Sequence, residues 1–236
     1  MNENLTNQTY SQAGVYGQSL GAYTAKTFGW MFAGLLVTFM VSVGVLTTGA
    51  LLYIVQIPGW YYVLGIAEIV TVLFLSARIQ KMSVGMARGM FFLYAVLNGI
   101  VFSVYFLLFD LLVLLGVFML TSLFFGVMAL IGYFGKVNFS GLRPFMLGGL
   151  IFLMGFWLLG MFIDLSGFEL IACTVGIFLF LLFTAYDTKK IKMYYQYYGH
   201  SQEMAAKASI FSALALYLDF INLFLYILRV LGNRRN

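Results

Sequence analysis

The stretch GMFFLYAVLNGIVFSVYFLLFDLLVLLGVFMLTSLFFGVMALIGYFG, residues Gly89–Gly135, contains a single charged residue, Asp110, in 47 positions. An apolar run of about 18 or more residues is long enough to cross the roughly 30 Å hydrocarbon core of a bilayer as a helix. This stretch is therefore long enough for two membrane-crossing helices joined by a tight turn. It assigns the chain to the integral membrane proteins.

The composition of the whole chain supports the same class. Hydrophobic residues make up 63% of the chain and charged residues 9%, whereas soluble domains are about half apolar and about a quarter charged. Such a chain has too little polar surface to face water, so the lipid bilayer is its main partner and no part is a soluble enzyme domain. The net charge of +5 does not indicate nucleic-acid binding, because the cations flank apolar segments, where they set membrane orientation.

Apolar runs between charges and turn residues predict an all-α integral membrane fold with seven segments. A polar cytoplasmic tail is expected over residues 1–22 and one transmembrane domain over residues 23–236. Pro58-Gly59 separates the first two segments, and Pro144 suits the first turn of a helix. The predicted segments are Thr27–Leu52, Trp60–Ala77, Gly89–Phe109, Leu111–Phe134, Pro144–Ile163, Phe168–Tyr186 and Ala208–Leu231.

The distribution of cations predicts the orientation. With seven crossings, the amino-terminal side carries ten of the thirteen Lys and Arg residues, and the positive-inside rule puts that side in the cytoplasm. Arg229, Arg234 and Arg235 would lie opposite if the last segment crosses fully, so this segment either crosses against the bias or re-enters. The ten are Lys26, Arg78, Lys81, Arg88, Lys136, Arg143, Lys189, Lys190, Lys192 and Lys207.

Ionisable residues inside a membrane span are costly, so each is a functional hypothesis. Asp219 is the strongest, because it lies mid-segment in LALYLDFINLFLYIL, twelve residues after Lys207 and ten before Arg229. Asn222 follows three positions later, on the same helix face. The alternative for Asp219 is a structural hydrogen bond that holds the helix in its bundle.

Asp187 ends the sixth predicted segment, where by itself it would be interpreted as a carboxylate at a helix end that is either solvated or paired with Lys190 or Lys189. With Asp219 on the next helix it gains a second interpretation. Two carboxylates that share a low-dielectric site titrate as a coupled pair, which can switch charge near physiological pH. A guanidinium such as that of Arg78 would stabilise the charged form.

Glu68 lies in the middle of the second segment. It is either a further ion ligand along a path or a neutral carboxyl that is hydrogen-bonded between helices. Cys173 is the single cysteine, so an intrachain disulfide is excluded and a thiolate metal site is not expected. No cofactor is expected.

Four motifs resemble the transmembrane Bax inhibitor motif family, in its Bax inhibitor-1-like bacterial form. They occur in the family's order between about residues 20 and 232, and the last two are long and specific. They read SARIQKMS from Ser76, YAVLNGIVFS from Tyr94, TAYDTKKIK from Thr184 and LYLDFINLFLYILRVLG from Leu216.

The resemblance implies a seven-helix bundle whose last helix is central, which favours a full crossing for the last segment. It also implies a calcium leak gated by pH. In the matching positions, Asp187 and Asp219 would sense protons and transiently hold calcium, Arg78 would bridge them and Glu68 would line the ion path together with Asn222. Calcium is then the transported ion, not a resident cofactor, and the inner (plasma) membrane is the expected location.

Two other functions remain open at this stage. The polar tail, or the 188–207 loop, could bind membrane protein partners of quality control or stress response, and deletion of residues 1–20 would then abolish function. An intramembrane aspartyl protease would also place two aspartates on consecutive helices. However, such proteases carry Gly-x-Gly-Asp, whereas this chain has Leu216-Tyr-Leu-Asp219, whose bulky side chains would block a substrate backbone.

Overall fold

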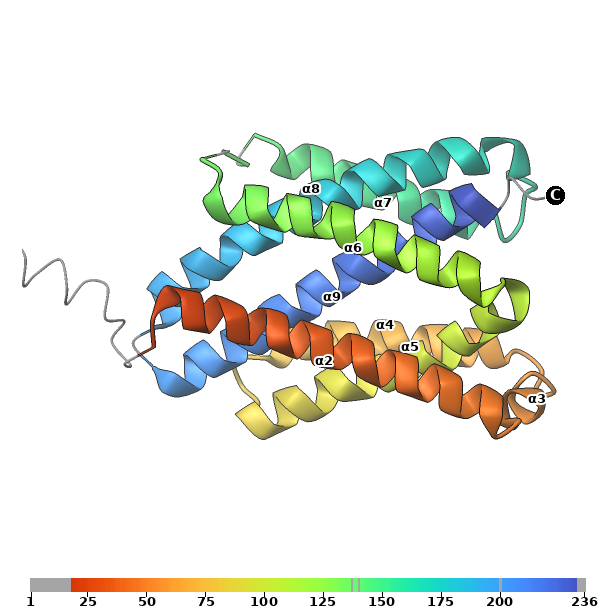
Figure 1. The fold of residues 1–236 in the computed structure, drawn as a ribbon, viewed down its shortest axis with the longest axis horizontal. Helices are drawn as coiled ribbons and strands as arrows, with labels where there is room; N and C mark the ends of the chain where they lie inside the picture. Colours follow the sequence, from red (N-terminus) through yellow and green to blue (C-terminus); the bar gives the residue numbers. More distant parts are fainter. Residues whose placement is uncertain (1–17, 137, 140, 200, 233–236) are drawn as a thin grey trace, which may run out of the picture. The chain divides into compact units, whose positions relative to one another are not determined.

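The computed structural model describes residues 18–136, 138–139, 141–199 and 201–232, and every regular element in them is helical (Figure 1). Most of the predicted tail, residues 1–17, and the cations Arg234 and Arg235 lie outside the described residues. The helices are α2 (Leu20–Thr47), α3 (Ala50–Ile54), α4 (Trp60–Arg78), α5 (Val84–Leu108), α6 (Leu111–Phe134), α7 (Arg143–Leu159), η1 (Ser166–Phe168), α8 (Glu169–Tyr198) and α9 (Gln202–Gly232).

Six of these helices, α2, α4, α5, α6, α8 and α9, are long and apolar enough to cross a membrane. The protein is therefore an all-helical membrane protein. The fifth predicted segment corresponds to α7, which has 17 residues and a length of about 26 Å at 1.5 Å per residue. This is shorter than the roughly 30 Å hydrocarbon core, so the seventh crossing stays a prediction. Pro144 does lie in the first turn of α7.

Two predictions about the elements are corrected by the structure. The first predicted segment, Thr27–Leu52, is divided, because Gly49 adopts a left-handed φ of 70° that ends the turn after α2 and starts α3. The 188–207 region is not a loop, because α8 continues twelve residues past Tyr186 and α9 begins at Gln202. Lys, Gln and Met in this stretch are good helix formers that carry the helices beyond the apolar run.

The chain forms two compact units. The first contains the residues up to Leu108 together with Lys190–Tyr217, and the second contains Phe109–Lys189 together with the residues from Leu218 onward. Each of the long helices α8 and α9 contributes to both units. The single transmembrane domain predicted over residues 23–236 stays a prediction.

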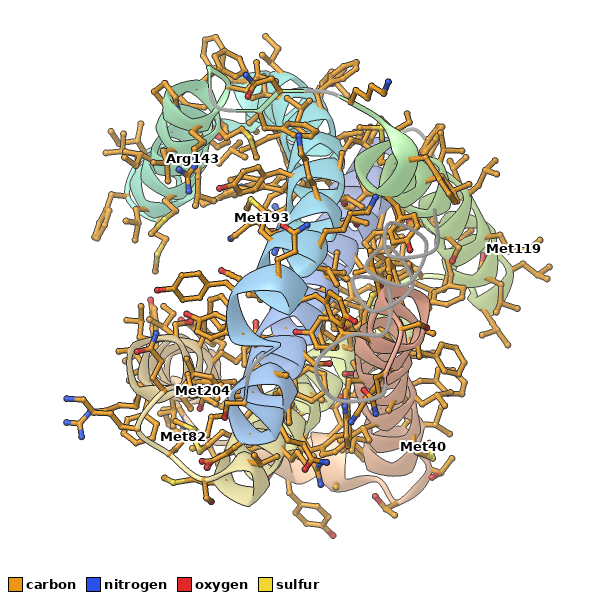
Figure 2. The ribbon with its side chains drawn as sticks, turned by 90° about the vertical axis from the view of Figure 1, so that its left-hand side faces the viewer. Met40, Met82, Met119, Arg143, Met193 and Met204 are labelled. Atoms are coloured by element: carbon orange, nitrogen blue, oxygen red, sulfur yellow. The ribbon has the colours of Figure 1, made fainter. Side chains whose placement is uncertain are left out.

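In the first unit, α5 packs against both α2 and α4. Buried polar groups join these helices to the amino-terminal half of α9: the hydroxyls of Thr38 and Tyr217 are 2.7 Å apart, and those of Thr27 and Ser209 are 2.9 Å apart. The outer surface of α2 is apolar, as Met40 illustrates (Figure 2). This arrangement, polar inside and apolar outside, suits a lipid solvent.

In the second unit, α9 contacts α6, α7 and α8. Phe220 packs edge-on against two phenylalanines of α6, the hydroxyl of Tyr226 accepts a hydrogen bond from Trp157 of α7 at 3.1 Å, and its ring stacks on Phe180 of α8. In its most apolar stretch α9 has 72% of its residues buried, against 11–39% in the other five spans. The helix α9 is thus the most buried of the six long helices, and the expected seven-helix bundle around it stays a prediction.

A full crossing of the last segment is favoured over re-entry. The helix α9 runs without a break for 31 residues, which corresponds to about 46 Å. A re-entrant segment would need a turn within the membrane, and the described residues of α9 contain none. Arg229 therefore lies near the end opposite to Lys207.

Candidate functional site

Asp187 and Asp219, the predicted pair, both belong to the second unit and both are buried, with 9% and 4% of their surfaces exposed. They lie on the consecutive helices α8 and α9. Asp187 is followed by eleven more helical residues, so its interpretation as a solvated carboxylate at a helix end is wrong. The lysine- and tyrosine-rich stretch that follows Asp187 is part of the same helix, which ends at Tyr198.

The surroundings of Asp187 are polar on one helix face. Thr184 and Thr188 are both fully buried, and Thr184 donates its hydroxyl hydrogen to the carbonyl of Phe180 at 2.8 Å. The hydroxyl of Thr188 has no hydrogen-bond partner among the described residues. Sequence reasoning missed Thr188, although its spacing of four from Thr184 puts both on one face.

Close packing of α6 against α8 lies directly beside this face. Gly132 of α6 approaches the backbone of Ala185 so closely that a Cβ at this glycine would collide with it. Ala185 precedes Asp187 by two residues. The small residue at position 132 therefore brings the backbones of α6 and α8 together about half a turn before Asp187, as is common where membrane helices meet.

The residue after Asp219 anchors this part of α9 to α6. This residue, Phe220, lies 5.4 Å from Phe118 and 5.5 Å from Phe125, measured between ring centroids. Asn222 donates its side-chain amide to the carbonyl of Leu218 at 2.8 Å, so its oxygen is the group that could face an ion. Asp219 itself is 4% exposed, so its carboxyl group lies in a setting of low dielectric constant.

Glu68 and Arg78 lie in the first unit, on α4. Glu68 Oε1 is buried without a hydrogen-bond partner among the described residues. Arg78 is the last residue of α4 and is exposed. Because Arg78 and the two aspartates belong to separate units, the predicted bridge between them stays a prediction.

A resident metal site has no support in the described part of the chain, where no three His, Cys, Asp or Glu side chains gather in a way that could hold an ion. Calcium prefers six to eight oxygen ligands. The available oxygens at Asp187 and Asp219 therefore suit passage of an ion better than tight binding, and whether they contact one is a proposal.

Comparison with known proteins gives the family. The sequence pattern of the family described as "Inhibitor of apoptosis-promoting Bax1" matches residues 20–236. The chain is 35% identical to the inner membrane protein YbhL of Escherichia coli over 92% of this chain and 93% of YbhL. It is 31% identical to the uncharacterized protein RP147 of Rickettsia prowazekii over 97% and 96%, and 34% identical to an uncharacterized protein of Deinococcus radiodurans over 91% of both. From its motifs, its helices and this match over nearly all of its length, the chain belongs to the Bax inhibitor-1 family of multi-pass membrane proteins.

Proposed function

We propose that this protein is a calcium-permeable cation leak whose flux depends on pH through Asp187 and Asp219. The observation that carries the proposal is the burial of two carboxylates in one compact unit, on consecutive helices of a membrane protein. Buried ionisable groups in a membrane are expensive and mark ion or proton paths. The family is not known for enzymes, so transport is favoured over a protease.

The chemistry of the pair accounts for pH sensitivity. When both carboxylates are ionised they repel each other, and a proton taken up by either one removes that repulsion. A change of one charge on α8, whose backbone packs closely on α6 at Gly132 and Ala185, would act on helix packing, because packed interfaces move between discrete arrangements. Proton uptake would thereby be converted into a change of the ion path.

Glu68 and Asn222 are proposed as oxygens along the path. The buried Oε1 of Glu68 without a hydrogen-bond donor supports the interpretation as an ion ligand over a hydrogen bond between helices through that atom. Arg78 is proposed to stabilise the ionised pair. The amino terminus is proposed to be cytoplasmic on the positive-inside pattern, and the inner membrane is the proposed location because the relative YbhL is named as an inner membrane protein.

The test is calcium influx into liposomes that contain a calcium-sensitive dye, followed across physiological pH, from about pH 6 to pH 8, with a coupled pair of carboxylates as the proposed sensor. Wild-type flux should change with pH, and Asp187→Asn or Asp219→Asn should flatten that dependence. Asp164→Asn is the matched control, because Asp164 is an exposed loop carboxylate whose pKa is lowered by a hydrogen bond from the backbone amide of Ser166 at 3.0 Å. Glu68→Gln should lower the flux at every pH.

The opposite result has a defined meaning. If no protein-dependent flux is measured at any pH, the leak is refuted and a regulatory role with membrane protein partners becomes the leading function. Deletion of residues 1–20 then separates the two: a leak survives the deletion, whereas partner binding through the tail does not.

A further inference from the structure

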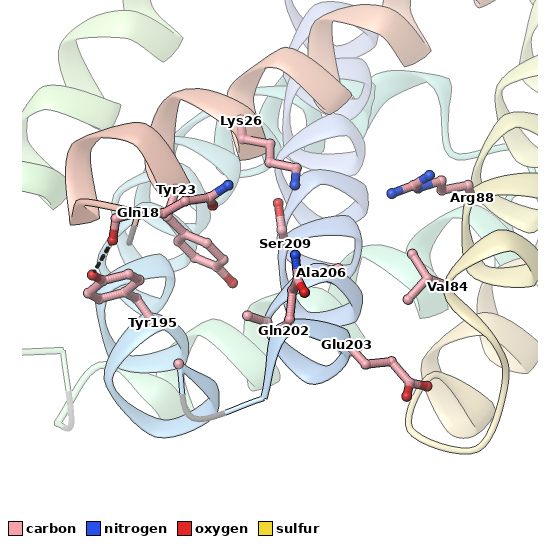
Figure 3. Close-up of a pocket in the computed structure, with 12 residues that line it drawn as sticks. Gln18, Tyr23, Lys26, Val84, Arg88, Tyr195, Gln202, Glu203, Ala206 and Ser209 are labelled. Carbon is pink, nitrogen blue, oxygen red and sulfur yellow. Dashed lines mark hydrogen bonds between the residues drawn. The ribbon is translucent and has the colours of Figure 1, made fainter. Parts of the chain in front are cut away.

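A cavity of about 350 Å³ opens in the first unit. It lies where α2, α5 and α9 begin and α8 ends (Figure 3). Its lining includes Tyr23, Lys26, Arg88, Tyr195, Gln202 and Ser209. None of these residues is used by the proposed leak.

A buried hydroxyl without a partner points into this cavity. Tyr23 is 3% exposed, and its Oη has no hydrogen-bond partner among the described residues. Its ring packs against that of Tyr195, whose own hydroxyl donates to the carbonyl of Gln18 at 2.7 Å (Figure 3). Since burial of an unsatisfied donor costs free energy, the Tyr23 hydroxyl is available to a ligand in the cavity.

Two cations reach toward the same space from opposite walls. Figure 3 shows the ammonium of Lys26, from α2, and the guanidinium of Arg88, from α5, directed toward the region around Ser209. Within the described chain neither one forms an ion pair, although the Arg88 guanidinium lies 5.1 Å from the centre of the Trp30 ring. The cavity also has a carboxylate, Glu203, but this is paired with Lys207 at 2.7 Å. The uncompensated charge of the lining is therefore positive.

The helix ends add to this potential. Three helices begin at the cavity, at Leu20, Val84 and Gln202, and the amino-terminal end of a helix carries a partial positive charge that favours anions. Lys26 lies about 9 Å and Arg88 about 6 Å along their helices from these starts.

We propose that this cavity binds a phosphate group, supplied by an anionic phospholipid headgroup of the adjacent leaflet. Lys26 and Arg88 would bind the phosphate oxygens, in the way that basic pockets between membrane helices bind anionic headgroups. The Tyr23 hydroxyl would donate a third hydrogen bond, which gives its buried oxygen the partner it lacks. A free phosphate offers the same oxygens and is the alternative source that the experiment must separate.

The experiment uses the full-length protein in neutral detergent and counts bound molecules by native mass spectrometry. Three probes are titrated: phosphatidylglycerol, phosphatidylcholine of equal chain length, and inorganic phosphate. Phosphatidylglycerol should bind at one site, and Lys26→Gln/Arg88→Gln should weaken it at least about tenfold, because each basic group near a headgroup contributes substantially to its binding. Tyr23→Phe should weaken binding by a smaller factor with the fold intact.

The matched control is Lys81→Gln/Lys136→Gln, which removes two exposed charges that do not line the cavity. This variant should bind phosphatidylglycerol as the wild type does. Equal losses in both double variants would mean general surface attraction and would overturn the proposal, as would equally tight phosphatidylcholine binding. Binding of inorganic phosphate with the same dependence on Lys26 and Arg88, without lipid binding, would keep the phosphate site and refute the lipid as its source. Circular dichroism of each variant identifies any loss of folding. If the double variant at Lys26 and Arg88 does not fold, Tyr23→Phe is the deciding variant: weaker phosphatidylglycerol binding supports the site, and unchanged binding overturns it.

Discussion

Glu169, the first residue of α8, forms an ion pair with Arg229 near the end of α9, with 3.4 Å between Oε1 and Nη1. The guanidinium of Arg229 also lies over the ring of Trp157, 3.9 Å from its centroid. Arg229 is one of the few cations that the positive-inside pattern leaves on the opposite side. A carboxylate and an aromatic face compensate this charge locally, which explains how α9 can cross with an arginine at its far end.

Arg229→Gln is expected to lower the free energy of unfolding by about 1–2 kcal/mol, because both the ion pair and the cation–π contact are lost. Glu169→Gln should cost less than about 1 kcal/mol, because the two side chains are about a third exposed and solvent screens the pair. Denaturant unfolding in detergent micelles measures both. Equal losses would contradict a contribution from the Trp157 ring, and Arg229→Lys, which keeps the charge, is the control.

Thr38→Val is expected to destabilise the first unit by about 1–3 kcal/mol. The substitution removes the oxygen that lies 2.7 Å from the hydroxyl of Tyr217, a fully buried residue, and leaves that hydroxyl without its partner. In Thr38→Val/Tyr217→Phe neither polar group remains, so the loss should be smaller than the sum of the two single losses. Unfolding of the four proteins measures this coupling, and additive losses would argue against the hydrogen bond.

Gly132→Ala is expected to destabilise the second unit by roughly 1–3 kcal/mol, because the added methyl group meets the backbone of Ala185. Gly126 of the same helix has open space where a Cβ would lie. Gly126→Ala should therefore be neutral or up to about 1 kcal/mol stabilising. If the proposed leak operates, Gly132→Ala should also reduce its pH dependence, since it changes the packing of α6 against α8, the helix that carries Asp187. Equal behaviour of both variants would argue against the close contact.

The crossing of α7 can be tested by cysteine labelling from one side of the membrane. Cys173 is 1% exposed, so an impermeant thiol reagent should not label its thiol. Lys136→Cys and Asp164→Cys flank α7 and should be labelled from opposite sides if its 17 residues span the bilayer. Labelling from the same side would show that α7 does not cross. On the proposed orientation, Lys81→Cys should behave like Lys136→Cys.

The candidate site was predictable from the sequence only in part. Asp219 was identified because no helix end lies close enough to let its charge reach water. Asp187 was expected at a helix end, and its burial could not be predicted, because the polar residues after Tyr186 are compatible with either a loop or a longer helix. Tyr23 gave no signal at all, since a tyrosine near the start of an apolar run ordinarily marks a membrane interface.

The sequence alone determined the solvent of this protein and the approximate positions of its helices, because long uncharged runs have no stable alternative to a helix in lipid. It also determined the family, since the motifs around Asp187 and Asp219 are long. The tertiary structure decided which polar groups are buried, which of them have partners, and that Lys26, Arg88 and Tyr23 meet at one cavity. These properties depend on contacts between segments far apart in the chain, and a pattern read along one segment contains no information about which neighbour covers it.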